Sequence, residues 1–185
     1  MKNTSIGTWA YNVGPYGESP IPFDTVGKTL SELKFDGLEL GGFNGYPNPG
    51  NHPEKEHRDG LKEKMTNWGL SFSGFAQDLW SEQLLNTDDQ SKYISAFKSN
   101  VDFAVDLGIK GVRVDCVQPP TIHAEADFDI LFNRLTKTWD TCINYAADKG
   151  IYVTWEFEPG FAFNKPSYVL MVLDKLQYDN FGLMY

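Results

Sequence analysis

Two glutamates, Glu156 and Glu158, lie two residues apart in the run WEFEPG at 155–160. If this run is a β-strand, alternate side chains point to one face, so the two carboxylates share a side of the sheet. Unpaired carboxylates this close repel each other and lose hydration. A divalent cation with hard oxygen ligands would relieve both penalties, and so would an arginine paired with each glutamate. The spacing alone leaves both interpretations open.

Charged residues occupy matching places in two other predicted strands. Glu39 lies in 36–41, and Arg113 and Asp115 lie in 110–117. In a β/α barrel one row of each strand faces the helices and must be apolar, whereas the other row can be polar near the carboxyl ends of the strands. A doubly wound sheet would need both rows apolar in its central strands. The apolar rows expected here are Leu38 and Leu40, Val112 and Val114, and Val153, Trp155 and Phe157.

The elements that position these side chains follow one repeated pattern. An amphipathic helix ends at a glycine and a β-rich run follows at once, as at Gly69, Gly108 and Gly150. A glycine just past a helix can adopt the left-handed conformation that closes the last turn. The recurrence is typical of stacked β/α units rather than of hairpins. The sequence predicts strands near 4–10, 36–41, 70–76, 110–117, 151–158 and 180–185, with helices near 23–34, 53–67, 91–107, 127–149 and 166–177.

These elements predict an α/β chain with the fold of an incomplete (β/α)8 TIM barrel. The sequence supplies about five βα units plus a sixth strand, in a single domain over residues 1–185. A complete barrel usually needs about 250 residues. We therefore expect this domain to be partial and to lack the C-terminal units.

Composition narrows the range of partners. The chain has 25 acidic and 16 basic residues, giving a formal net charge of −9. That charge repels nucleic acid and anionic membrane surfaces, and no stretch approaches the roughly 18 apolar residues of a membrane span. We expect no nucleic acid partner, no membrane and a cytoplasmic location. Cys116 and Cys142 are expected to be small buried side chains rather than a disulfide or a nucleophile.

Four short motifs resemble those of one known family. The run VTWEFEPG at 153–160 resembles the fifth-strand motif of the xylose-isomerase-like TIM barrels, the sugar phosphate isomerase and epimerase superfamily. GTWA at 7–10, FDGLEL at 35–40 and GVRV at 111–114 also resemble their counterparts. The resemblance implies that Glu156 is a ligand of a divalent metal, Mn²⁺ or Mg²⁺ first, with Co²⁺ or Zn²⁺ as alternatives. The family's second ligand is an aspartate just past the sixth strand, and the later histidine and glutamate ligands have no positions in these 185 residues.

The resemblance also implies an activity in carbohydrate metabolism. It indicates a metal-dependent sugar (phosphate) isomerase or epimerase that removes a proton next to a carbonyl and forms an enediolate. Glu156 would be one of two catalytic glutamates. The expected substrate contacts are Trp9, Glu39, Arg113 and Glu158. Trp9 could instead be a rim aromatic without a ligand, and a buried ion pair between strands is the favoured role of Glu39 and Arg113.

Loops at two predicted strand ends complete the candidate site. Gln77 and Asp78 directly follow the third strand, where they could hydrogen-bond sugar hydroxyls or cap the loop, and capping is favoured. The loop at 41–50 is long and rich in turn residues. A loop in this position usually covers a barrel mouth.

Three alternatives to an isomerase remain open. The first is a keto-sugar lyase, a dehydratase or a C-glycoside-deglycosidase-like enzyme on the same barrel, which would begin with the same proton abstraction. The second is a DNA repair endonuclease, which needs a basic groove and a cluster of histidines for zinc; His52, His57 and His123 fall in loops or beside helix starts. The third is a fragment that is inactive alone, or is completed by a partner such as a second copy, because strands one and six would have unpaired edges. The expected ligand is a small sugar or polyol.

Overall fold

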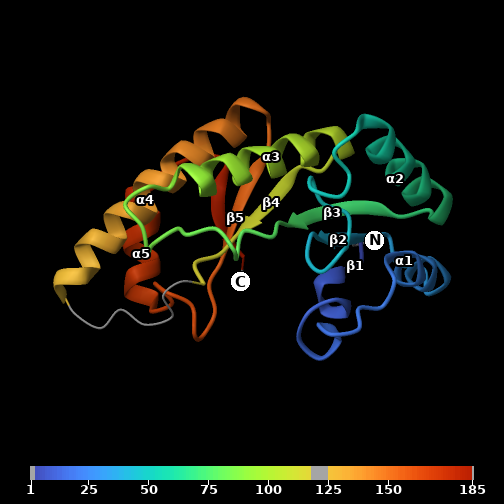
Figure 1. Cartoon of the computed structure of the whole chain (residues 1–185), viewed down its shortest axis with the longest axis horizontal. Coiled ribbons are helices and arrows are strands. Elements are labelled where there is room, and N and C mark those ends of the chain that lie inside the picture. The colour runs from blue at the N-terminus through green and yellow to red at the C-terminus, as the bar shows by residue number, and fades with distance from the viewer. Residues whose placement is uncertain (1–2, 118–124, 185) are drawn as a thin grey trace. The chain divides into compact units, whose positions relative to one another are not determined.

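The computed structural model describes residues 3–117 and 125–184, and it shows an α/β chain with six strands in one sheet (Figure 1). The strands follow one another in chain order across the sheet. The pairings of the first with the second, the second with the third and the fifth with the sixth are parallel. The strands are β1 (Ser5–Gly7), β2 (Gly37–Gly41), β3 (Ser71–Ala76), β4 (Gly111–Val114), β5 (Tyr152–Glu156) and β6 (Phe181–Met184).

Helices alternate with these strands, which confirms the β/α repeat predicted from the sequence. They are α1 (Phe23–Glu32), α2 (Lys55–Trp68), α3 (Ser91–Leu107), α4 (Glu125–Asp148) and α5 (Pro166–Lys175), with two short 3₁₀ helices, η1 (Thr8–Tyr11) and η2 (Gly14–Tyr16). No helix in the described residues is long and apolar enough to cross a membrane. The fold of an incomplete barrel is therefore observed in its first five βα units and sixth strand.

The chain divides into two compact units. The first unit comprises residues 3–78 and 100–112, and the second comprises residues 79–99 and 113–184. The first unit holds β1, β2, β3, α1 and α2. The second holds β5, β6, α4 and α5.

The predicted end of the first strand is wrong. The strand stops at Gly7 instead of residue 10, because residues 8–11 turn into η1. The side chain of Thr8 explains the turn. Its hydroxyl donates to the carbonyl of Glu39 (3.0 Å) and accepts from the N–H of Gly41 (2.9 Å), so a side chain replaces the backbone ladder at this end of β2.

A register shift between β2 and β3 gives Glu39 its surroundings. Leu38 pairs with Phe72, but Glu39 pairs with Gly74, so β3 has one extra residue at this point. A Cβ at Gly74 would lie 3.6 Å from Cγ of Glu39. The bulge thus places a residue without a side chain opposite the glutamate, as bulges near functional sites often do.

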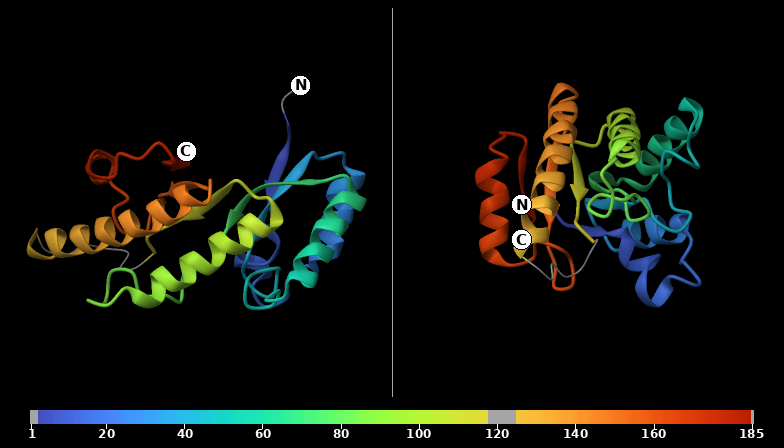
Figure 2. Two further views of the ribbon diagram at one scale, coloured as in Figure 1. Left: turned by 90° about the horizontal axis from the view of Figure 1, so that it is seen from above. Right: turned by 60° about the vertical axis from the view of Figure 1, so that its left-hand side comes forward.

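The core of the first unit forms where the apolar rows predicted from strand alternation meet the helices. Leu38 and Leu40 on β2 are fully buried, and Phe75 on β3 lies 5.5 Å from the ring of Phe103 on α3. Helices α1 and α2 lie side by side in this unit (Figure 2). Their contact is close at one point, since a Cβ at Gly27 would lie 2.2 Å from the ring of Trp68.

The core of the second unit is built around two tryptophans. Trp139 on α4 and Trp155 on β5 are both buried and pack edge to face, with ring centroids 5.3 Å apart. The indole N–H of Trp139 donates to the hydroxyl of the buried Tyr93 (3.1 Å), which satisfies the polar edge of the ring. Helices α4 and α5 lie beside each other in this unit (Figure 2).

Both cysteines are buried and unbridged, as the sequence predicted. Burial raises the pKa of the Cys142 thiol to about 12. Burial, followed by the charge of Asp115, also raises the pKa of the Cys116 thiol. Both side chains stay protonated at neutral pH, so neither is an activated nucleophile.

Two glycines in helices test the contact between α1 and α2. We expect Gly27→Ala to lower the free energy of unfolding by about 1–2 kcal/mol, because the new methyl overpacks against Trp68. Gly60→Ala on α2 is the matched control, since nothing lies within 4 Å of its Cβ position. It should stabilise the protein by about 0.5–1 kcal/mol through helix propensity. Urea denaturation measures both values, and equal shifts of the same sign would contradict the contact.

Candidate functional site

An ion pair lies at the carboxyl ends of β4 and β5. Nη1 of Arg113, the third residue of β4, lies 3.0 Å from Oε2 of Glu156, the last residue of β5. The side chain of Arg113 is 6% exposed and that of Glu156 is 19% exposed. A charge so far removed from water is tolerated only when a partner compensates it. Arg113 therefore compensates the charge of the Glu156 carboxylate at the end of its strand.

This pair combines two groups that proton-transfer chemistry requires. A carboxylate at the end of a strand can accept a proton from a carbon acid. A guanidinium beside it presents a fixed fork of N–H donors, which suits an oxygen that gains negative charge during the reaction. Because both groups are mostly buried, their electrostatic effect is screened less than at the surface.

Glu158 lies beyond the strand, which corrects the predicted strand end. β5 stops at Glu156 rather than at residue 158, so the alternation argument does not reach Glu158. Pro159 follows it and has no N–H for a ladder. The side chain of Glu158 is exposed, and its carbonyl accepts from the N–H of Phe161 (3.0 Å) and the amide of Asn164 (3.2 Å). Its substrate contact stays a prediction.

The loop after Glu158 contains a strained residue that sequence reasoning missed. Phe163 has φ of +57° and is 1% exposed. A bulky residue rarely adopts a left-handed conformation, which costs roughly 1–3 kcal/mol. The packing of the ring in an aromatic cluster with Phe128, Phe132 and Tyr168 offsets this conformational cost. The N–H of Ala162 also donates to the carbonyl of Cys116 (2.8 Å), which ties this loop to the segment after β4.

In the first unit, a second carboxylate holds a tryptophan. The indole N–H of Trp9 donates to Oε2 of Glu39 (3.0 Å). The place of Trp9 depends on two glycines: a Cβ at Gly7 would lie 2.2 Å from the indole nitrogen, and a Cβ at Gly41 would lie 2.8 Å from the backbone nitrogen of Trp9. The half-buried ring is thus fixed in one orientation at the end of β1 and β2.

Glu39 and Arg113 each have an observed partner of their own. The structure gives Glu39 a role in orienting Trp9 and gives Arg113 a partner in Glu156. The predicted pair between Glu39 and Arg113 stays a prediction, and so does the stacking of Trp9 on a sugar face.

A second tryptophan, Trp80, was missed by sequence reasoning. Its indole N–H donates to Oδ2 of Asp115 (3.0 Å), the residue directly after β4. Trp80 lies in the segment between β3 and α3, where the sequence shows no regular pattern. The only available signal was its position shortly after a predicted strand end.

Gln77 does not cap its loop as the sequence analysis favoured. The residue directly follows β3 and is 3% exposed. Within the described residues, neither its amide nitrogen nor its amide oxygen has a hydrogen-bond partner. Leaving such a group unsatisfied costs about 1–3 kcal/mol. The buried amide is therefore a candidate for contact with a ligand.

The histidines lie away from the strand ends. His52 and His57 line a cleft of about 410 Å³ between α1, the loop before α2 and α2 itself, with ring centroids 6.0 Å apart. Burial, followed by the neighbouring His57, lowers the pKa of His52. His123 lies outside the described residues. Within residues 3–117 and 125–184, no three histidine, cysteine, aspartate or glutamate side chains gather closely enough to hold a metal ion.

Glu156 is therefore the one predicted metal ligand within the residues that the structure describes. Its carboxylate has the oxygen donor that Mg²⁺ and Mn²⁺ prefer, and its place at a strand end suits a ligand. One carboxylate does not complete a coordination sphere. The residues present fit a metal in donor type and position but not in number.

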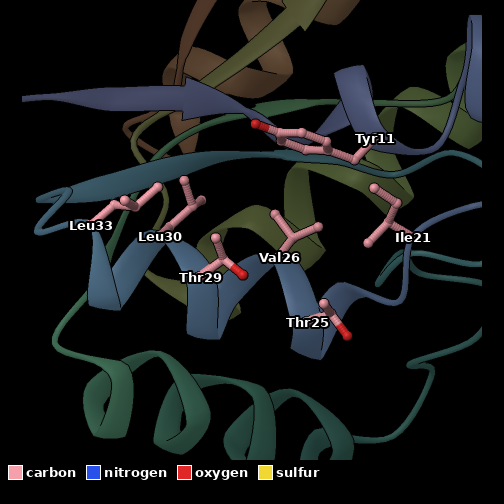
Figure 3. A pocket seen from close by; sticks show the side chains of 7 residues that line it. All are labelled: Tyr11, Ile21, Thr25, Val26, Thr29, Leu30 and Leu33. Carbon is pink, nitrogen blue, oxygen red and sulfur yellow. The ribbon is translucent and has the colours of Figure 1, made fainter.

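An apolar cavity of about 170 Å³ lies elsewhere in the first unit (Figure 3). Figure 3 shows Val26 and Leu30 of α1 and Leu33 just after it along one side, with Tyr11 and Ile21 across from them. The lining offers hydroxyls but no carboxylate, histidine or basic side chain. The cavity cannot supply the acid–base groups found at β4 and β5.

Comparisons with known proteins agree with this geometry. A family model described as "Xylose isomerase-like TIM barrel" matches residues 28–185. No curated protein sequence matches the chain.

Solved structures match almost the whole chain. The probable 3-DHS dehydratase involved in petrobactin synthesis from Bacillus anthracis is 17% identical with a TM-score of 0.72, covering 99% of this chain and 62% of that one. D-psicose 3-epimerase with D-tagatose from Clostridium cellulolyticum H10 is 16% identical with a TM-score of 0.70, covering 100% and 63%. A xylose isomerase-like TIM barrel protein from Mycobacterium smegmatis in complex with magnesium is 13% identical with a TM-score of 0.68, covering 99% and 65%. The chain thus spans somewhat less than two thirds of each of these proteins, and at such identities the likeness shows the fold alone.

The ion pair gives a prediction about stability. Arg113→Met should lower the free energy of unfolding by about 2–4 kcal/mol, because it leaves a mostly buried carboxylate without this partner. The double variant Arg113→Met/Glu156→Gln should recover at least about 1 kcal/mol relative to the sum of the two single variants. Urea denaturation of the four proteins measures this coupling. Additive effects would show that the pair contributes no interaction energy.

Proposed function

Because the chain belongs to the xylose isomerase-like TIM barrel family, we propose that it forms the N-terminal part of a divalent-metal-dependent isomerase or epimerase of sugars or sugar phosphates. The observation that carries the proposal is the Arg113–Glu156 pair at the ends of β4 and β5. The carboxylate of Glu156 and the guanidinium of Arg113 lie 3.0 Å apart at the end of the strands where barrel enzymes hold their chemistry, which supports Glu156 as the base.

The reaction begins with proton abstraction. Glu156 removes the proton from the carbon next to a ketose carbonyl. The guanidinium of Arg113 donates to the substrate oxygen that gains charge, which stabilises the enediolate. A second glutamate on the opposite side returns a proton, giving epimerisation or isomerisation. Glu156 is half of that pair.

A divalent cation, Mn²⁺ or Mg²⁺, is proposed as the cofactor with Glu156 as one ligand. When bound, it supplies the charge that polarises the carbonyl and the neighbouring hydroxyl. The magnesium complex of the similar protein from Mycobacterium smegmatis supports this choice. By the family resemblance, the other ligands have no matching positions in residues 1–185.

Three residues, Trp9, Arg113 and Glu158, are proposed to contact the substrate, and Glu39 is proposed to act by holding Trp9. Trp9, oriented by Glu39, provides an aromatic surface, and Arg113 provides hydrogen-bond donors. Glu158 follows Glu156 in a loop that the aromatic cluster around Phe163 fixes in place.

The cellular setting proposed is a cytoplasmic enzyme with a small sugar or polyol as its partner. The net charge of −9 disfavours nucleic acid and anionic membrane surfaces as partners. A homo-oligomer is compatible with the fold.

A dehydratase is the second candidate, because a probable 3-DHS dehydratase is among the similar structures. The first step is the same proton abstraction by Glu156. The enolate then forms a C–C double bond and expels the hydroxyl of the next carbon, which leaves as water with the proton that Glu156 took up. The product distinguishes the two reactions, since only the dehydratase loses water.

The proton abstraction can be followed by exchange in D₂O. We expect the protein with Mn²⁺ to introduce deuterium next to the carbonyl of at least one of a panel of ketoses and cyclic ketones, measured by NMR. Glu156→Gln should slow the exchange by about 100-fold or more, because it removes the base. Glu63→Gln, which neutralises an exposed carboxylate on α2, is the matched control and should have no effect. Absence of exchange across the panel would contradict the proposal.

Metal dependence gives a separate prediction. Treatment with EDTA should stop the exchange, and Mn²⁺ or Mg²⁺ should restore it. Isothermal titration should show that Glu156→Gln weakens Mn²⁺ binding by about tenfold or more, since a neutral amide is a poorer ligand for a hard cation. Exchange that survives EDTA, or unchanged Mn²⁺ affinity in the variant, would argue against Glu156 as a ligand.

A further inference from the structure

Trp80 is a large aromatic side chain that stays exposed within a well-anchored segment. It is 39% exposed. The leucines on either side of it in the chain, Leu79, Leu84 and Leu85, are 6%, 4% and 0% exposed. The leucines of this segment are therefore buried while Trp80 remains partly accessible to solvent.

Hydrogen bonds hold the segment in place. The N–H of Glu82 donates to the carbonyl of Leu79 (3.0 Å), which closes the turn that carries Trp80. Arg134 on α4 donates to the carbonyl of Leu85 (2.7 Å) and forms an ion pair with Asp88. The exposure of Trp80 is thus a property of a fixed turn rather than of a loosely held loop.

The indole is oriented by its polar edge. Its N–H donates to Oδ2 of Asp115 at 3.0 Å, so the hydrogen-bonding need of the ring is met within the chain. Because 39% of the residue is exposed, part of its apolar surface is open to solvent and can bind a ligand by contact rather than by hydrogen bonds.

The position of Asp115 brings this ring near the proposed base. Asp115 lies two residues after Arg113, and extended backbone separates such residues by about 7 Å. Arg113 in turn contacts Glu156 at 3.0 Å. The chain of contacts runs from Trp80 through Asp115 and along the end of β4 to the ion pair, all within the second unit.

We propose that Trp80 is a platform for one face of a ring-form ligand, a pyranose-type keto-sugar or a cyclitol, bound beside Glu156. A six-membered sugar or cyclitol ring presents several C–H groups on one face, which a flat indole can cover. An open-chain polyol presents no such face and loses more conformational freedom when it is held flat. This inference rests on the proposed function, which assigns the proton abstraction to Glu156. It adds the substrate class, a ring-form sugar or cyclitol.

The test compares two ligands that neither react nor interconvert. Methyl β-D-glucopyranoside is locked as a ring, and D-glucitol is an open chain. Titrations followed by ligand NMR should show that the wild-type protein binds the pyranoside at least about fivefold more tightly than the glucitol. Saturation transfer should reach the C–H protons of the pyranoside.

Variants of Trp80 then show whether the affinity for the pyranoside depends on this aromatic ring or on other parts of the protein. Trp80→Ala should raise the dissociation constant of the pyranoside by about five- to tenfold, the value of one aromatic contact, and should reduce the preference over glucitol. Trp80→Phe keeps an aromatic face and should stay within about threefold of wild type. Tyr152→Ala is the matched control, because Tyr152 is 43% exposed but lies at the opposite end of a strand, the start of β5.

Each outcome bears on the inference. No pyranoside binding by wild type, equal affinity for the two ligands, or unchanged binding by Trp80→Ala would overturn it. If Trp80→Ala does not fold, the saturation-transfer result on wild type and the Trp80→Phe affinity decide. Pyranoside binding that depends on Trp80, together with no deuterium exchange on any ketone, would contradict the proposed reaction. The same result would still support the binding of a ring-form ligand at Trp80.

Discussion

The pairing of Arg113 with Glu156 is the constraint around which the second unit is organised. The mostly buried carboxylate at the end of β5 is stabilised by a guanidinium on β4 that lies 3.0 Å away. These charged residues lie in one row of each strand, and the opposite rows, Val114 and Trp155 among them, build the core. The fold and the proposed chemistry therefore share the same two side chains.

The same kind of contact recurs between carboxylates and tryptophans. Trp9 donates to Glu39 in one unit, and Trp80 donates to Asp115 in the other, each at 3.0 Å. In both cases the acidic residue lies in a strand or directly after it, and the indole lies outside the strands, on η1 for Trp9 and on an irregular segment for Trp80. A carboxylate anchored by a rigid strand can hold an aromatic ring that the loop alone would leave mobile. Acidic residues at strand ends can thus serve binding without touching a ligand.

The sequence predicted the regular part of this molecule well, because regularity is local. Strand alternation identified the buried rows of Leu38, Val112 and Val153, and the glycines after α2, α3 and α4 marked where the next strand begins. Contacts between distant residues were not predictable in this way. Thr8 ends β1 by bonding to β2, and Phe163 adopts a left-handed conformation for the sake of an aromatic cluster. Neither leaves a mark in the neighbouring sequence.

The bulge between β2 and β3 has an evolutionary consequence. Because Glu39 pairs with Gly74 and not with Ser73, β3 carries one residue more than β2 requires. Loss of Ser73 would restore regular alternation and leave Phe75 paired with Leu40 on the buried face. One residue can thus be lost from β3 without exchanging inside for outside, and only the local bend and twist of the bulge would disappear.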